Sequence, residues 1–394
     1  MNKLPNGWQI KTLGDIFLIE RGSSPRPIKS FLTNDNNGIN WIKIGDAKNN
    51  SKYIYQSAEK IRPEGKKYSR FVEIGDLILS NSMSFGRPYI MKTIGCIHDG
   101  WVVLRKILKN IIYEEYAYYI LSSNQVHSEF SKLAAGSVVK NLSIDRIKQV
   151  YIPIPPLDEQ KRIASALSKI DAYLENTIKL IEEKERFKRG IAKKLLTCKE
   201  GENIPEARFK GFEDEWEETQ ILEFVNNNII KIEKGKSITK SKIEEGDIPV
   251  IAGGKTPPYY HNKYNYNFSC ITISASGSAG YVWFHDYKIW ASDCHVIYTD
   301  NKRYNIKFLY HYLKNIQDLI YYLQVGGVQK HVYAKDLIKL NIPNITIEEQ
   351  EKIGGYLSLL DEEIDNLKKQ KELIKEMKRG AMQKLLSGEV RLLE

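Results

Sequence analysis

Features that would place a chain in a membrane or in a disulfide-stabilised fold are scarce in this sequence. Among 394 residues there are only 4 cysteines, scattered along the chain without a C-x-x-C pair. Such spacing suits reduced thiols in a cytosol better than a disulfide framework. The longest apolar runs are a handful of residues, far short of the ~20 that a membrane helix needs. The first fifteen residues contain no apolar segment typical of a secretory signal, so we expect a cytoplasmic protein without membrane contact.

Length and charge set the next limits. A chain of 394 residues is too long for one ordinary core, so two or more domains are expected. Its 42% hydrophobic and 27% charged residues are typical of a soluble globular protein. The net charge of +10 and the isoelectric point of about 9.0 favour a polyanion such as nucleic acid as partner, although solubility alone also explains them.

One segment of the chain occurs twice. Residues 152–196 align with residues 342–386 at a constant offset of 190 and without a gap, and 17 of the 45 aligned positions are identical. The identities include Glu159 with Glu349 and Leu167 with Leu357. Chance would give two or three identities, so the segment is an internal duplication.

The repeat extends upstream of this segment. Gly136, Val138 and Lys140 match Gly326, Val328 and Lys330 at the same offset. Further upstream the offset is 194, where Ser80–Gly86 and Asp99 match Ser274–Gly280 and Asp293, and Trp8 matches Trp216 near the start of each copy. The repeat unit is therefore a globular part followed by the duplicated segment, and loops account for the changing offset.

Each duplicated segment is predicted to be a long helix. Apolar residues recur every three or four positions from Ile163 to Ile181 and from Ile353 to Leu367, which is the stripe of a coiled coil. A second helix with the same stripe is its natural partner, so we expect the two to pair antiparallel about a pseudo-twofold axis. Gly190 and Gly380 lie within the helical pattern, where glycine costs ~1 kcal/mol relative to alanine. Close approach of another backbone explains them, and local fraying is the alternative.

The globular parts mix short β-like runs, such as GDLILSNS and CITISAS, with helical stretches. The sequence thus predicts an α+β fold with two globular α/β-mixed domains in a tandem pseudo-twofold repeat, separated by two long antiparallel coiled-coil helices. The expected boundaries are 1–152 for the first domain, 153–200 for the first helix, 201–342 for the second domain and 343–394 for the second helix.

Motifs that suggest catalysis are incomplete. Thr256-Pro257-Pro258-Tyr259 lacks the leading acid or amide of the adenine methyltransferase motif, and Pro249 stands where a P-loop would need its first glycine. The Glu-x-Lys triplets at 182–184 and 376–378 fall on the predicted helices. Zinc-ligand spacing is absent. We expect no catalytic residue and no metal site.

Several segments together resemble the specificity subunit of type I restriction–modification systems. They are LPNGWQIKTLGDI, IPIPPLDEQKRI, IPVIAGGKTPPYY, the doubled KRG…KLL helix end and the doubled G-x-V-x-K turn. The resemblance covers essentially the whole chain. It implies two target recognition domains that each read half of a bipartite DNA sequence, and paired helices that act as a ruler and dock two methyltransferase subunits. Restriction subunits complete such complexes, with S-adenosylmethionine, ATP and Mg²⁺ expected on partner subunits and no cofactor in this chain.

Candidate DNA contacts lie in polar loops that combine basic residues with glycine and serine, because glycines let backbone N–H groups approach phosphates and the polar side chains bond base edges. In the first copy they are Arg21, Ser23, Ser24, Arg26, Ser80, Asn81, Ser82, Ser84, Arg87, Lys140 and Asn141. In the second copy they are Lys236, Ser237, Lys240, Lys255, Ser274, Ser276, Ser278, Lys330 and His331. An ordinary solvated loop position is the alternative for each.

Apolar residues outside the coiled-coil stripe are candidates for partner binding: Tyr173, Phe187, Ile191, Tyr356 and Met377. Two other function classes stay open at this point. One is a self-contained nuclease or methyltransferase, against which the missing motifs argue. The other is a structural coiled-coil scaffold whose globular domains bind something other than DNA.

Overall fold

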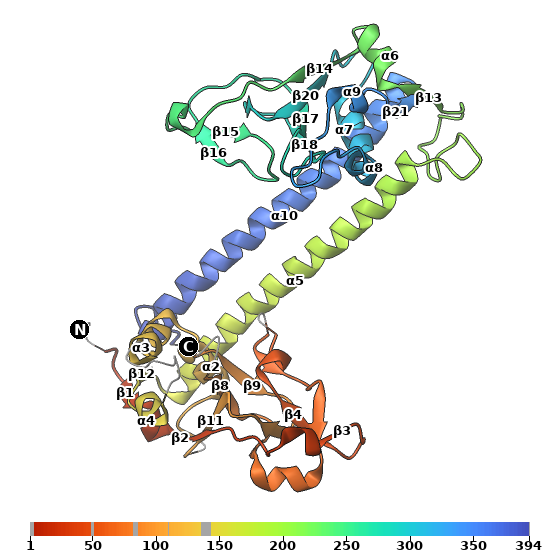
Figure 1. Ribbon diagram of the computed structural model, residues 1–394. Coiled ribbons are helices and arrows are strands. Elements are labelled where there is room, and N and C mark those ends of the chain that lie inside the picture. The colour runs from red at the N-terminus through yellow and green to blue at the C-terminus, as the bar shows by residue number, and fades with distance from the viewer. Residues whose placement is uncertain (1–3, 49–50, 82–85, 109, 135–142, 394) are drawn as a thin grey trace. The chain divides into compact units, whose positions relative to one another are not determined.

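The structure is a computed structural model that describes residues 4–48, 51–81, 86–108, 110–134 and 143–393. The chain folds into two compact units. Unit 1 comprises Met1–Asn176 together with Lys371–Glu394, and unit 2 comprises Thr177–Gln370. Two long helices belong to both units: α5 (Leu157–Leu196) and α10 (Ile347–Ser387), which Figure 1 shows as unbroken.

The globular part of unit 1 is an α+β domain. Its strands are β1 (Gln9–Thr12), β2 (Phe17–Arg21), β3 (Leu32–Thr33), β4 (Ile39–Ile42), β5 (Tyr53–Ile54), β6 (Glu59–Ile61), β7 (Arg70–Val72), β8 (Leu77–Ser80), β9 (Pro88–Met91), β10 (Gly95–Ile97), β11 (Trp101–Lys106) and β12 (Tyr151–Ile154). Its helices are α1 (Leu13–Ile16), α2 (Glu114–Leu121), α3 (Asn124–Ala134) and α4 (Ile144–Lys148), with 3₁₀ turns at Ile28–Ser30, Ile44–Asp46 and Pro63–Tyr68. The sheets have the orders β2-β11-β8-β9-β5, β3-β6-β4-β10-β7 and β1-β12.

Alternating side chains of β11 build two cores. Val102 and Leu104 face the helices and join the larger core, whereas Trp101 and Val103 face the second five-stranded sheet. All four are buried, as a strand covered on both faces requires. This central strand therefore ties the two layers of the domain together.

Unit 2 repeats the design with fewer strands. Its strands are β13 (Glu217–Gln220), β14 (Ile230–Lys234), β15 (Ile248–Ile251), β16 (Tyr259–His261), β17 (Cys270–Ser274), β18 (Val282–His285), β19 (Trp290–Ala291), β20 (Cys294–Thr299) and β21 (Asn341–Asn344). Its helices are α6 (Ile221–Asn226), α7 (Ile306–Asn315), α8 (Gln317–Tyr322) and α9 (Ala334–Leu337), with a 3₁₀ turn at Lys240–Lys242. The sheets have the orders β14-β20-β17-β18, β16-β15-β19 and β13-β21.

The same alternation appears in β17 of unit 2. Ile271 and Ile273 pack in the core that includes the helices, whereas Cys270 packs with Ile251 and Ala291 of the smaller sheet. The predicted duplication of an α+β domain is thus confirmed at the level of strands, sheets and cores.

The two long helices run antiparallel within each unit. In unit 1 the start of α5, through Ile163 and Leu167, shares one core with Leu385 and Leu386 near the end of α10. In unit 2 the roles are exchanged: the start of α10, through Ile353 and Leu357, shares a core with Leu195 and Leu196 near the end of α5. The antiparallel pairing predicted from the apolar stripe is therefore confirmed.

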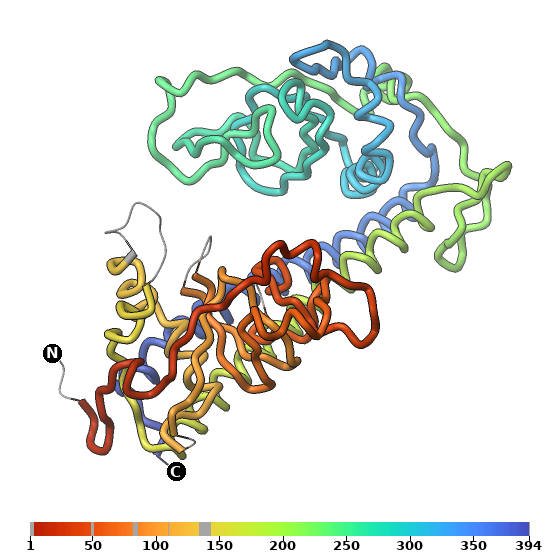
Figure 2. The backbone as a smooth tube through the Cα atoms, turned by 60° about the horizontal axis from the view of Figure 1, so that its bottom comes forward, coloured from red at the N-terminus to blue at the C-terminus, as the bar shows by residue number. Residues whose placement is uncertain are grey.

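A buried glutamate ties the start of each long helix to distant parts of its unit. In unit 1, Glu159 accepts hydrogen bonds from Trp8 Nε1 at 3.0 Å and from Arg391 Nη2 at 2.7 Å. The same arginine donates to the backbone oxygen of Asn6 at 2.9 Å, which brings the C-terminal segment back beside the first strand (Figure 2). These donors outweigh burial and hold the pKa of Glu159 below its usual range.

Unit 2 contains the same arrangement from other positions. Glu349 accepts from Arg208 Nε and Nη2 at 2.7 and 2.8 Å and from Trp216 Nε1 at 3.4 Å. The arginine follows α5 here and α10 in unit 1, so in both units the segment after one long helix closes on the start of the other.

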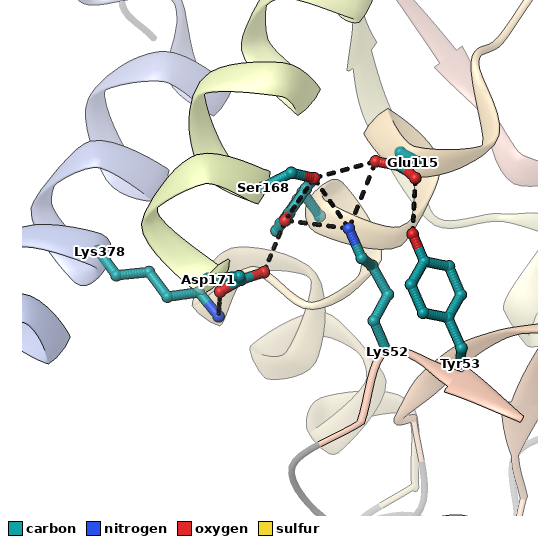
Figure 3. A network of polar contacts seen from close by, with 7 residues as sticks. Lys52, Tyr53, Glu115, Ser168, Asp171 and Lys378 are labelled. Carbon is teal, nitrogen blue, oxygen red and sulfur yellow. Dashed lines mark hydrogen bonds and ion pairs between the residues drawn. The ribbon is translucent and has the colours of Figure 1, made fainter. Parts of the chain in front are cut away.

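About three turns further along α5, a polar network joins both long helices to the domain of unit 1 (Figure 3). Lys378 of α10 lies 2.6 Å from the carboxylate of Asp171 on α5, and the Tyr119 hydroxyl donates to the same carboxylate at 2.6 Å. Ser168 of α5 contacts the Tyr119 hydroxyl at 3.1 Å.

The network continues to the edge of the sheet. Glu115 accepts hydrogen bonds from Ser168 at 2.9 Å and from the Tyr53 hydroxyl at 2.7 Å, and Lys52 reaches both Glu115 and Ser168. These contacts outweigh burial and lower the pKa of Glu115, so the carboxylate stays charged. The network fixes the helices on the domain by paired charges rather than by apolar contact alone.

Some expectations about the helices need correction. A Cβ atom on Gly190 or Gly380 would meet no described atom within 4 Å, so close approach of another backbone does not explain these glycines. Nor do they fray the helices, which are continuous there. The expected boundaries at 152 and 342 fall inside β12 and β21, because these strands pair with the first strand of each domain. Among the described residues, no helix is long and apolar enough to cross a membrane.

Candidate nucleic-acid interface

The predicted contact loops gather at one end of the main sheet in each domain. In unit 1 the pairing of Arg21 with Val102 and of Ser80 with Trp101 places the end of β2, the end of β8 and the start of β11 together. In unit 2 the ends of β14 and β17 meet the start of β20 in the same way. Two corresponding loop clusters therefore follow from one strand topology.

A glycine after the first of these strands allows the chain to cross closely over the sheet end. A Cβ on Gly22 would lie 2.0 Å from the backbone oxygen of His98, and one on Gly235 would lie 2.4 Å from that of Ser292. Only glycine fits such an approach. The polar residues that follow each glycine are thereby held against the turn before β11 or β20.

In unit 1 the loop from Arg21 to Arg26 is organised by Asp99. Ser24 Oγ donates to Asp99 Oδ1 at 3.0 Å, and Arg21 Nε donates to the backbone oxygen of Asp99 at 3.2 Å. The Arg26 guanidinium lies 4.0 Å from the same carboxylate, yet its side chain is 84% exposed. Burial opposes the charge of Asp99, but the Ser24 hydrogen bond and neighbouring groups outweigh it and lower the pKa of this carboxyl. The arginines therefore stand at the surface around a fixed negative charge.

Other candidates of the first copy face inward. Ser23 Oγ donates to the backbone oxygen of Tyr68 at 3.2 Å. Ser80 and Asn81 are only 1% and 2% exposed, and Ser80 Oγ accepts from the backbone N–H of Arg87. The expectation that Ser80 and Asn81 present surface side chains is therefore wrong: these residues shape the turn. Arg87 is half-buried. Four further candidates lie outside the described residues: Ser82, Ser84, Lys140 and Asn141.

In unit 2 the most exposed candidates follow β14 and β15. They are Lys236, Ser237, Lys240 and Lys255. The Lys236 backbone oxygen accepts from Trp290 Nε1 at 2.9 Å, which holds this loop on the smaller sheet.

The turn from Ser274 to Gly280 forms the centre of the second cluster. Ser274 is 4% exposed and shapes the turn, again contrary to a surface role, whereas Ser276 Oγ donates to Asp293. The backbone N–H of Ser278 donates to Gly253 at 2.6 Å, which joins the turn to the loop that carries Lys255.

A second turn packs beside it. Val332 N–H donates to the backbone oxygen of Ala275 at 3.0 Å, and a pair of backbone hydrogen bonds between Val325 and His331 closes the turn between them. Lys330 is exposed on this turn, and the His331 ring stacks on Tyr333 with centroids 6.3 Å apart. Residues from three separate loops thus converge on one surface of unit 2.

A family model described as the type I restriction modification DNA specificity domain matches this chain twice, at residues 5–183 and 213–376. The chain belongs to this family. The two matches coincide with the two copies of the repeat, and they favour the DNA-reading interpretation over that of a scaffold without DNA contact.

Relatives of this DNA specificity family match along the whole chain. A putative type I restriction enzyme specificity subunit, MjaX, from Methanocaldococcus jannaschii is 28% identical over 421 residues, covering 100% of this chain and 96% of that protein. A putative type I specificity subunit from Mycoplasma genitalium is 26% identical over 362 residues, covering 85% and 91%. The crystal structure of a type I restriction–modification S subunit from M. genitalium shares the fold, with a TM-score of 0.65, 20% identity and 98% coverage of both chains.

The five partner-binding candidates of this family member differ in their surroundings. Tyr173, Phe187 and Met377 are 47%, 53% and 50% exposed on the long helices. Tyr356, by contrast, packs on the core of unit 2 and meets the Phe209 ring edge-on at 5.6 Å, so it is used within the chain.

A groove on α5 contains another candidate. Ile191 packs partly on the core of unit 2, and its other side lines a groove of about 400 Å³ together with Glu183, Arg186, Phe187, Gly190 and Lys194. The open face of Gly190 lies in this groove, which is therefore accessible to a bulky side chain from outside.

Sequence reasoning missed three residues of the loop clusters. Asp99 and Asp293 appear as a matched pair in the repeat, and that match was the available signal. Lys314 joins the second cluster from α7, where its ammonium group lies 4.2 Å from the Tyr281 ring centroid. Nothing local marks this lysine, because it sits in an apolar helical pattern far along the chain from the loops.

One of the incomplete catalytic motifs has a structural role in the helix pair. Lys378 of the second Glu-x-Lys triplet pairs with Asp171 in the helix pair. Within the described part of the chain, no three His, Cys, Asp or Glu side chains are grouped to hold a metal ion. The four cysteines are free thiols.

Proposed function

We propose that this chain is the non-catalytic DNA-reading subunit of a type I restriction–modification complex. Each domain reads one half of a bipartite, asymmetric DNA site, and the paired helices set the number of unread base pairs between the halves. The observation that carries the proposal is the pair of loop clusters, built on matched strand ends with different side chains.

The differences between the clusters support two unlike half-sites. Around Asp99, unit 1 presents Arg21 and Arg26, whose guanidinium groups suit bidentate bonding to guanine. Around Asp293, unit 2 presents serine hydroxyls and lysines instead. Because the strands that carry the two loop clusters correspond while the hydrogen-bond donors on the loops differ, the two domains should read half-sites of similar length but different sequence.

Phosphate contact accounts for the remaining basic residues. Lys330, on its exposed turn, is a candidate in unit 2, and Lys140 and Asn141 occupy the matching positions of the first copy. Each phosphate that a lysine neutralises lowers the logarithm of affinity by about 0.9 per tenfold rise in salt. A basic chain with such loops therefore binds double-stranded DNA with a steep salt dependence.

The long helices are the docking surface for two methyltransferase subunits. Exposed Phe187 and Met377 occupy matched positions, three residues before the matched Gly190 and Gly380. An aromatic or thioether side chain beside an open glycine favours insertion of a partner's side chain. Restriction subunits then join the complex in the cytoplasm. The partner subunits carry S-adenosylmethionine, ATP and Mg²⁺, and this chain carries no cofactor.

Reconstitution with the methyltransferase subunits tests the proposal. Cells expressing both proteins should gain adenine methylation at one split, asymmetric sequence, which long-read sequencing of the genome maps. Cells expressing the methyltransferase alone serve as the control. Methylation at the same sites without this chain, or at a single unsplit sequence, would refute the proposed role.

A further inference from the structure

Two lysines from distant segments meet on one aromatic ring in unit 2. The ammonium group of Lys314, on α7, lies 4.2 Å from the Tyr281 ring centroid, and that of Lys255, in the loop after β15, lies 5.5 Å from it. Tyr281 ends the turn that begins at Ser274, whose backbone N–H donates to the Tyr281 oxygen at 3.1 Å. The ring and both cations therefore stand at the base of the central turn of the second loop cluster.

The ammonium group of Lys314 is held in place by neutral partners. It donates to the backbone oxygen of Val282 at 3.3 Å and to Gln317 Oε1 at 3.2 Å, which uses two of its three protons. Among the described residues, neither Lys314 nor Lys255 has an acidic side chain within salt-bridge distance. Two cations near one ring attract an anion, because the Coulomb attractions of both lysines add at a position close to each of them.

The charges around Lys314 come from three other elements. Lys255 and Lys188, the latter on α5, oppose its positive charge, while Asp361 on α10 favours it. Asp361 is already paired with Lys188. Burial, followed by the two lysines, lowers the pKa of Lys314 to about 8, and its ammonium group lies over the Tyr281 ring.

We propose that Lys255 and Lys314, whose ammonium groups both lie near the Tyr281 ring, form a binding site for a DNA backbone phosphate, and that filling it draws a proton onto Lys314. The proposal rests on the DNA-reading role proposed above. A phosphate at this place satisfies the third ammonium proton, neutralises both cations and fixes the duplex against the Ser274–Gly280 turn. In the first copy, Arg87 aligns with Tyr281 at the offset of 194. The first domain therefore has a cationic side chain at the position where the second domain has the aromatic ring.

Because binding requires protonated Lys314, DNA affinity should fall as pH rises through the pKa of this lysine. Below pH 7 Lys314 is protonated in the free chain, so affinity is independent of its titration. Above pH 8 binding must first restore the proton, and affinity falls by about tenfold between pH 7 and pH 9 for one proton and a pKa of about 8. A purely structural lysine that only supports Tyr281 gives no such dependence.

Binding of the reconstituted complex to a labelled duplex tests the site. Three variants are compared: Lys314→Met removes the charge, Lys314→Arg keeps it at every pH used, and Lys307→Met removes an exposed charge elsewhere on α7. The Met variant at 314 should bind about tenfold more weakly at pH 7, with a salt slope smaller by about 1. The Arg variant should bind as tightly as the wild type at pH 7 but keep its affinity at pH 9. Lys307→Met should behave as the wild type.

A second measurement does not depend on sequence-specific DNA binding. In the full chain labelled with ¹³C,¹⁵N-lysine, whose ammonium groups stay unmodified, the Lys314 Cε signal is assigned by its loss in Lys314→Met. This signal should titrate near pH 8, and its titration should move to higher pH on addition of inorganic pyrophosphate. No movement with pyrophosphate overturns the phosphate site. If the complex binds its duplex but Lys314→Met changes neither affinity nor pH dependence, the site is wrong while the DNA-reading role stands. If the complex binds no duplex although the signal moves, the DNA-reading role fails and the anion site stands.

Discussion

At the scale of single residues, the two units use different side chains for the corresponding contact between the domain and a long helix. Tyr119 of unit 1 donates its hydroxyl to Asp171 and contacts Ser168 on α5. At the matching place in unit 2, His311 Nε2 lies 3.1 Å from Ser358 Oγ on α10. Burial raises the pKa of the Tyr119 hydroxyl, so it is neutral at any physiological pH. The imidazole can titrate, so the second contact is sensitive to acid and the first is not.

Replacing His311 should therefore reduce the acid sensitivity of folding. Burial, with Lys188 and Lys307 nearby, lowers the pKa of His311 to about 3 in the folded state. The unfolded chain takes up a proton below its ordinary pKa of about 6.5, so this histidine costs about 1.4 kcal/mol of stability per pH unit as pH falls from 6.5 toward 3. Between pH 7 and pH 5 the wild type should lose about 2 kcal/mol more than His311→Gln, measured by denaturant unfolding. Exposed His127→Gln is the matched control, and equal losses in all three proteins would contradict the prediction.

The loop residues show how far residue-level prediction could go. The exposed positions Arg26, Lys236 and Lys255 were found from composition, because a charged side chain in a glycine-rich loop is rarely buried. Ser80 and Ser274 were misplaced, because a serine that closes a turn against a backbone N–H has the same local sequence as one that faces water. Lys314 was missed, because its neighbours are brought together only by the fold.

At the scale of elements, glycines in the long helices serve two different purposes. Gly354, in the first turns of α10, faces α7: a Cβ there would lie 2.6 Å from the backbone nitrogen of Phe308. Gly380, near the other end of the same helix, faces no described atom within 4 Å. Close backbone approach, which the sequence suggested for Gly380, thus occurs at Gly354 instead.

Alanine substitutions at these two positions should have opposite effects on stability. Gly354→Ala must push α7 away and should cost 1–3 kcal/mol, roughly the range of overpacked cores. Gly380→Ala adds a methyl group in open space and should stabilise the helix by about 1 kcal/mol. Thermal unfolding of the isolated full chain measures both. Stabilisation by Gly354→Ala would show that α10 does not need this close approach to α7.

Element boundaries were predictable where a local signal exists. Pro155 and Pro156 end a strand and Asp158 follows, which is a local signal for a helix start near Leu157, whereas the expected boundary stood at 153. Sheet order was not predictable, because it depends on pairings such as β2 with β11, which lie about 80 residues apart and leave no local pattern.

At the scale of the whole molecule, duplication is the feature that the sequence expressed most clearly. The constant offset of 190 across both helices required equal helices with equal partners, and the units indeed exchange the roles of helix start and helix end. The differing loops between these constant parts indicated two domains with separate specificities. The individual bases that each domain reads depend on side-chain geometry at the DNA surface, which no pattern of residues encodes.

The ruler role makes a prediction at this scale. Seven residues inserted after Asn176 in α5 and after Gln370 in α10 preserve the apolar stripe of both helices. They lengthen each helix by about 10 Å, or roughly three base pairs of DNA. Domain structure and loop residues are untouched by the insertion, so base reading should not change.

Genome-wide mapping of adenine methylation in cells with the wild-type or the lengthened chain, each with its methyltransferase subunits, tests the central claim most directly. Both proteins should methylate the same two half-sites in the same order, with about three more unread base pairs between them for the lengthened chain. An unchanged spacer, or a change in the sequence of either half-site, would contradict the account of two separate readers set apart by paired helices.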